Sequence, residues 1–147
     1  MKYFSGLVSE LADDLKKEKM PYLIFLEGPL GAGKTTFSQE FLEHLGVESG
    51  AVKSPTFLKM LEYTLPQGKI LHIDCYRMDH FDDVAKLSLE HYSDQAFLCL
   101  VEWPENFEKY LEEYPEVKSL ISFKRICRIK IKLSGENRIV QKVWENF

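Results

Sequence analysis

A glycine-rich stretch between an apolar run and a helical pattern constrains this chain more than any other feature. Gly28, Gly33, Lys34 and Thr35 occupy the fixed positions of G-x-x-x-x-G-K-[ST], the phosphate-binding P-loop. Glycines allow the positive φ angles that turn successive backbone N–H groups into one concave anion nest. The helix that follows adds its unpaired N-terminal N–H groups. The stretch predicts a strand, a loop and a helix that together bind the phosphates of a nucleoside triphosphate.

The polar side chains in and near this loop predict which residues bind phosphate and which bind the metal ion. Lys34 is placed to reach the β- and γ-phosphates, and the Thr35 hydroxyl to ligate Mg²⁺. Catalysis also needs an acidic group for the metal and a group that orients the nucleophile. Asp74 and Glu102 are candidates, because each follows an apolar run where a strand of an open α/β sheet ends. The spacing leaves open which of the two holds the ion and which orients water.

Strand and helix patterns alternate around the loop. Period-two or continuous apolar runs predict strands at residues 22–27, 59–65, 69–74, 96–101, 126–133 and 138–144. Amphipathic spacing predicts helices at residues 5–19, 34–45 and 104–114, the last ended by Pro115, and a weaker one around Phe81, Val84 and Leu87. We expect an α/β fold of the three-layer, P-loop NTPase-like type, with a mainly parallel central sheet and antiparallel edge strands.

Length and composition predict one ordinary domain over residues 1–147, built around the P-loop. The net charge of −4 argues against a dominant electrostatic grip on nucleic acid. No apolar run reaches the length of a membrane span or forms a signal core, so we expect a cytoplasmic protein with no membrane partner. Cys75, Cys99 and Cys127 lack disulfide or zinc spacing and are expected to be buried reduced thiols.

Other polar or aromatic residues have both a functional and an ordinary interpretation. Thr56, in the S-P-T-F turn at residues 54–57, could approach the γ-phosphate or Mg²⁺, or lie in a plain proline turn. Arg77 could touch phosphate or pair with a nearby acid. Trp103 is typical of a core or interface aromatic, and His72 of an ordinary strand residue. The basic residues Arg128, Lys130 and Lys132 are interpreted as a solvated face, with an RNA or protein contact as the alternative.

Four segments taken together resemble one family. They are the P-loop at residues 28–36, S-P-T-F at 54–57, H-I-D-C-Y-R at 72–77 and V-E-W-P-E at 101–105. In this order they resemble the TsaE family (formerly YjeE), the P-loop ATPases of bacterial tRNA threonylcarbamoyladenosine (t6A) synthesis. The resemblance covers about residues 7–115. Pro29 stands where the family usually has Asp, and Ser88 where it commonly has glycine.

The resemblance implies an activity, a set of site residues and partners. ATP and Mg²⁺ would be the cofactors, and the chain would hydrolyse ATP without itself catalysing threonylcarbamoyl transfer. The implied nucleotide-binding residues are Gly28, Leu30, Gly31, Ala32, Gly33, Lys34, Thr35, Thr36, Thr56 and Trp103. The implied catalytic residues are Lys34, Thr36, Asp74 and Glu102, and the metal ligands Thr35, Asp74 and Glu102. The partners would be TsaD and TsaB, with tRNA reached indirectly through their complex. Hydrolysis would support repeated transfer to adenosine 37 of the tRNA.

Two other functions are open to a small P-loop protein. A small-molecule kinase is the first, because the D-C-Y-R segment at residues 74–77 resembles the acid-arginine motifs of nucleoside kinases. No arginine-rich lid that would exclude water is evident in the sequence, which argues against it. A GTP-dependent switch is the second, and it lacks an N-K-x-D segment for reading guanine.

Overall fold

The computed structural model of the protein describes residues 4–17, 21–29, 31–48, 60–76, 96–121 and 123–147. Some predicted features lie outside these ranges: Leu30, the S-P-T-F turn with Thr56, Arg77, Ser88 and the helical pattern with Phe81, Val84 and Leu87.

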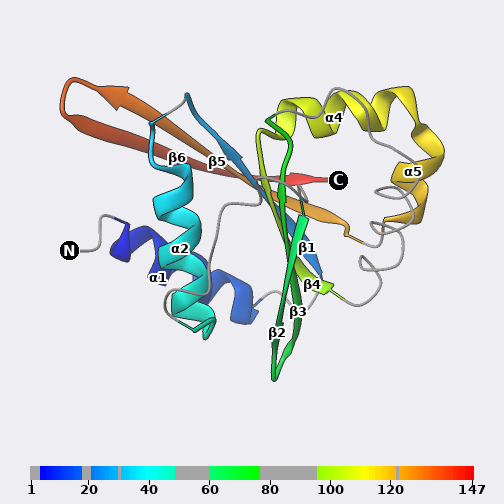
Figure 1. Cartoon of the computed structure of the whole chain (residues 1–147), viewed down its shortest axis with the longest axis horizontal. Coiled ribbons are helices and arrows are strands. Elements are labelled where there is room, and N and C mark those ends of the chain that lie inside the picture. Colours follow the sequence, from blue (N-terminus) through cyan, green and yellow to red (C-terminus); the bar gives the residue numbers. More distant parts are fainter. Residues whose placement is uncertain (1–3, 18–20, 30, 49–59, 77–95, 122) are drawn as a thin grey trace.

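Six strands form one sheet in the order β2-β3-β4-β1-β5-β6, drawn in Figure 1. The strands are β1 (Tyr22–Glu27), β2 (Met60–Leu65), β3 (Gly68–Asp74), β4 (Ala96–Glu102), β5 (Arg125–Ser134) and β6 (Asn137–Asn146). The inner pairs β3–β4, β4–β1 and β1–β5 are parallel. The edge pairs β2–β3 and β5–β6 are antiparallel hairpins. The predicted fold class is therefore confirmed.

The sheet lies between two helical layers, because its central strands are apolar on both faces. In β1, Ile24 and Leu26 pack with α1 (Ser5–Lys17) and α2 (Lys34–Leu45), while Phe25 packs on the opposite face. That face is covered by α4 (Pro104–Glu113) and α5 (Pro115–Leu120), as Figure 1 shows. No helix among the described residues is long and apolar enough to cross a membrane.

The prediction that the helix beginning at Pro104 is stopped by Pro115 is confirmed, but a second helix that was not predicted follows it. Pro115 is the first residue of α5, a second short helix that follows α4 after Tyr114. Proline lacks an N–H, but the first N–H groups of a helix have no intrahelical partner, so proline is well suited to this position. The same residue therefore stops one helix and starts the next.

The three cysteines are buried free thiols, as predicted. Burial raises the pKa of Cys99, and it raises that of Cys127 to about 12. Thiols in this state are poor nucleophiles and poor metal ligands. The cysteines therefore contribute packing to the sheet.

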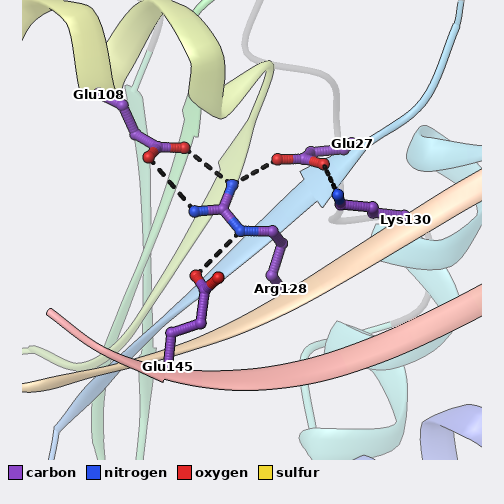
Figure 2. Close-up of polar contacts among 5 residues, drawn as sticks. All are labelled: Glu27, Glu108, Arg128, Lys130 and Glu145. Atoms are coloured by element: carbon purple, nitrogen blue, oxygen red, sulfur yellow. Dashed lines mark hydrogen bonds and ion pairs between the residues drawn. The ribbon is translucent and has the colours of Figure 1, made fainter.

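The interpretation of Arg128 as part of a solvated basic face is wrong. Its side chain is only 14% exposed and contacts three carboxylates, drawn in Figure 2. It donates to Glu27, the last residue of β1, to Glu108 of α4 at 2.8 Å and to Glu145 of β6 at 3.0 Å. Chiefly through Glu108, these bonds raise the pKa of Arg128. Arg128 therefore links its own strand, β5, to β1, α4 and β6.

Replacing Arg128 with methionine is expected to lower the free energy of unfolding by about 2–3 kcal/mol, measured by urea denaturation. Removing one partner leaves the carboxylates facing one another without a cation. Partial exposure of Glu108 and Glu145 keeps the loss below that of a fully buried pair. Lys130→Met is the control, since Lys130 is 45% exposed and lies 3.7 Å from Glu27. An Arg128→Met loss no larger than the control's would show that the cluster is not stabilising.

Candidate functional site

The glycine-rich loop joins β1 to α2 with the geometry of an anion nest. Gly31 and Gly33 have φ angles of 77° and 108°, in the left-handed region that favours glycine. Gly33 is also the N-cap of α2, so the free N–H groups of that helix face the loop. Gly28 is required for a different reason: a Cβ there would lie 2.8 Å from the carbonyl oxygen of Ile131 in β5. The neighbouring strand thus packs directly on the base of the loop.

Lys34 is buried, and its ammonium is held by neutral groups. Nζ donates to the carbonyl of Gly28 and to that of Pro29 at 3.2 Å, and it lies 3.8 Å from the ring centroid of Trp103. Burial lowers the pKa of Lys34, while the carboxylates of Glu102, Glu105 and Asp74 act in the opposite direction. A desolvated ammonium gains more from a phosphate than from carbonyls, because charge-assisted hydrogen bonds are the stronger ones. Lys34 is therefore suited to bind phosphate.

Asp74 and Glu102 lie side by side, because β3 and β4 are parallel neighbours that pair these two residues at their carboxyl ends. Glu102 is 3% exposed, and its Oε2 lies 2.7 Å from Nε2 of the buried His72. Asp74 is less buried, and its Oδ1 accepts a hydrogen bond from the Tyr76 N–H at 2.9 Å. Burial raises the pKa of Asp74, and this effect outweighs that hydrogen bond. One carboxylate is thus oriented by a histidine, and the other is nearer solvent.

Trp103 lines the same cavity as these carboxylates, at the start of α4. It is the N-cap of α4, and its φ of 58° makes it the one non-glycine residue with positive φ among the described residues. A bulky side chain in this region is strained, and such strain concentrates at functional sites. Its ring lies 4.8 Å from that of Tyr76, centroid to centroid, and under the Lys34 ammonium.

One cavity of about 340 Å³ brings most of the expected residues together. Its lining residues are Pro29, Gly31, Ala32, Gly33, Lys34, Thr35, Thr36, Asp74, Tyr76, Glu102, Trp103 and Arg138. Gly28 lies at the base of the loop and contacts Lys34 through its carbonyl. Thr35 is exposed and Thr36 half-buried, both in the first turn of α2.

The donors around the cavity fit a magnesium ion held jointly with phosphate. Among the described residues, no group of three or more His, Cys, Asp or Glu side chains could hold a metal by itself. Mg²⁺ usually takes only one or two carboxylates from a protein and the rest from phosphate and water. Asp74, Glu102 and the Thr35 hydroxyl supply such a partial set at the cavity.

The sequence patterns did not assign four residues to the site: Pro29, Tyr76 and Arg138, which line the cavity, and His72, which contacts Glu102. His72 was interpreted as an ordinary strand residue, yet it contacts Glu102. The signal was available in its position two residues before Asp74, which places both on one face of β3. Arg138, from β6, lines the cavity and donates from Nε to the Ala32 carbonyl at 2.8 Å. Nothing near Arg138 in the sequence indicates this contact.

Replacing Asp74 with asparagine is expected to raise the melting temperature slightly at neutral pH. A carboxyl whose pKa is raised by folding costs stability once it is ionised, so stability falls as pH rises from the unfolded pKa through the folded one. Asparagine is neutral at every pH and can still accept from the Tyr76 N–H. Melting curves of the two proteins should converge at acidic pH, where Asp74 is protonated. A lower melting temperature for Asp74→Asn at neutral pH would contradict this account.

The defining unit of P-loop α/β proteins is a strand that ends in a glycine-rich anion nest, followed by a helix that begins at the lysine of the nest. This chain has that unit in β1 and α2 and is of that class. It matches the family model "Threonylcarbamoyl adenosine biosynthesis protein TsaE" over residues 3–139. The chain belongs to the TsaE family.

Individual relatives agree with this assignment. The tRNA threonylcarbamoyladenosine biosynthesis protein TsaE of Bacillus subtilis is 41% identical over 103 residues, which are 70% of this chain and 61% of that protein's length. The protein of the same name from Aquifex aeolicus is 38% identical over 124 residues, 84% of this chain and 85% of that protein. The crystal structure of Bacillus subtilis YdiB superposes with a TM-score of 0.58 at 28% identity, covering 92% of this chain and 75% of that one.

Proposed function

We propose that this protein is the Mg²⁺-dependent ATPase of tRNA t6A biosynthesis, acting with TsaD and TsaB to support repeated threonylcarbamoyl transfer. The observation that carries the proposal is the convergence of Lys34, Asp74 and Glu102 on the cavity formed by the glycine-rich loop. The names of the relatives give the pathway, t6A synthesis. The tRNA is reached through the partner proteins, and the reaction is carried out in the cytoplasm.

Each side chain has a distinct task in the proposed hydrolysis. The loop N–H groups and Lys34 bind the phosphates and stabilise the charge that develops on the transferred group. Thr35 and Asp74 bind Mg²⁺, which supplies further charge neutralisation on the β- and γ-phosphates. Thr36 lies beside them in the first turn of α2 and contacts phosphate. Trp103 closes one side of the cavity and keeps the Lys34 ammonium desolvated.

Glu102 orients the attacking water in this proposal. A general base is usually oriented by a third group, and the contact between His72 Nε2 and Glu102 Oε2 is an arrangement of this type. When Glu102 is ionised, Nε2–H donates and holds the carboxylate in one orientation. Oε1 then remains for the water. Asp74 is nearer solvent, and the partner that the described residues give it is the Tyr76 N–H and not a histidine, so it is the better metal ligand of the two.

The test is Mg²⁺-dependent ATP hydrolysis by the protein alone and with added TsaD and TsaB, with no other phosphate acceptor present. Slow release of inorganic phosphate that rises when both partners are added is the expected result. If the partners change nothing and a nucleoside added to the assay becomes phosphorylated, the kinase alternative replaces the proposal. Lack of ATP binding in any combination would reject both.

A further inference from the structure

Arg138 is the one residue of the cavity that comes from the C-terminal hairpin. It lies near the start of β6, opposite Leu133 of β5. Its Nε donates to the carbonyl of Ala32 at 2.8 Å, across 106 positions of sequence. A Cβ on Gly33 would lie 3.2 Å from the same Nε, so the guanidinium packs closely on the loop. The hairpin therefore places a cation directly beside the phosphate nest.

The sheet order fixes the side of the loop on which Arg138 lies. β1, which carries the loop, has β4 on one side and β5 on the other. Glu102 and Asp74 end β4 and β3, on the first side. Arg138 belongs to β6, beyond β5, on the second side. Figure 1 shows the β5–β6 hairpin reaching past the segment that joins β1 to α2. The carboxylates and the arginine thus flank the loop from opposite sides.

This arrangement determines which end of a bound nucleotide lies near the carboxylates and which lies near the hairpin, provided that the proposed function holds. The metal and its carboxylates belong at the β- and γ-phosphates. The other end of the nucleotide then extends away from β4, over the loop and toward the hairpin. We propose that Arg138 binds the α-phosphate and ribose end of the nucleotide, opposite the catalytic carboxylates. A guanidinium is suited to this role because its planar fork of donors matches phosphate oxygens and its face can also stack on a base.

The distribution of charge in the cavity supports a phosphate-binding role for Arg138. In the described part of the chain, two cationic side chains line the cavity, Lys34 and Arg138, against the carboxylates of Asp74 and Glu102. Lys34 lies on the Trp103 side of the loop, near the carboxylates. Arg138 supplies positive charge at the far side. The hydrogen bond to Ala32 limits the guanidinium's freedom, which lowers the entropy cost of binding.

The experiment compares three probes by calorimetry in the presence of Mg²⁺: ATP, ADP and inorganic pyrophosphate, whose two phosphates can occupy the β- and γ-positions and which has no α-phosphate or ribose. For Arg138→Ala we expect the Kd for ATP and ADP to rise about tenfold or more, whereas that for pyrophosphate changes less than about twofold. At saturating ATP, the kcat of Arg138→Ala should fall by a smaller factor than its affinity for ATP. Equal losses for pyrophosphate and ADP, or a fall in kcat with unchanged ADP affinity, would place Arg138 elsewhere on the nucleotide and overturn the proposal.

Two further variants separate nucleotide binding from a structural role. Arg138→Gln keeps a side-chain N–H that could donate to Ala32 but removes the charge, and we expect it to lose ADP affinity as Arg138→Ala does. Wild-type ADP affinity in Arg138→Gln would mean that Arg138 only braces the loop. Lys132→Ala removes a charge from the exposed part of the same hairpin and should leave every Kd unchanged. Wild-type protein that binds none of the probes would reject the proposed function itself, a separate outcome.

Discussion

Replacing Lys34 with alanine is expected to abolish ATP hydrolysis and to weaken ATP binding strongly. The ammonium is buried in the cavity, and the other cationic side chain that lines it in the described part of the chain, Arg138, lies on the far side of the loop. Loss of one preorganised charge at the transferred group typically costs about 10²–10³-fold in rate, and loss of ground-state binding adds to it. Single-turnover hydrolysis and calorimetric ATP binding measure the two effects separately.

The fold should survive this substitution, which makes the result interpretable. Burial lowers the pKa of Lys34, so the charged form costs stability in the folded protein, and alanine removes that cost. We therefore expect a melting temperature equal to or above that of the wild type. Ser38→Ala is the matched control, since Ser38 lies one turn further along α2 and donates to the Lys34 carbonyl at 3.0 Å. Wild-type hydrolysis by Lys34→Ala would reject the phosphate-binding role of the loop.

The parts of the structure that could be predicted from the sequence depend on local patterns. The β1–loop–α2 unit is continuous in sequence, and its glycines and apolar run specify it without other segments. The hairpins were predictable for the same reason, since turns at Gln67 and Gly135 join neighbouring strands. The α5 helix was missed because proline both ends and begins helices, and the sequence around Pro115 permits either.

The parts that could not be predicted depend on contacts between distant segments. The His72–Glu102 pair exists because β3 and β4 are neighbours, a fact of sheet order and not of either strand's composition. In the sequence, Arg128 is one of three alternating basic residues. Only the fold places Glu108 of α4 within hydrogen-bonding distance of it. Arg138 reaches the loop only because β6 pairs with β5. Sequence reasoning thus identified residues by motif and missed those placed in the site by pairing.

Replacing Glu102 with glutamine is expected to lower kcat by about 10²–10⁴-fold while ATP affinity remains close to that of the wild type. Glutamine has nearly the same shape and its carbonyl oxygen can still accept from His72 Nε2–H, so the packing around β4 is retained. What is lost is the negative charge that accepts the proton of water. Steady-state hydrolysis measures the kcat, and calorimetric binding measures the affinity for ATP.

The Mg²⁺ dependence of the same variants decides which carboxylate holds the ion. If Asp74 is the ligand, Asp74→Asn raises the Mg²⁺ concentration needed for half-maximal hydrolysis, and excess Mg²⁺ restores part of the rate. Glu102→Gln then keeps the wild-type Mg²⁺ dependence, and excess ion does not rescue it. The reverse pattern would make Glu102 the ligand, and His72 would then orient a metal-binding carboxylate, an arrangement that is also found around protein metals. Because the two carboxylates are neighbours in the β3–β4 register, only a pair of variants measured together distinguishes these roles.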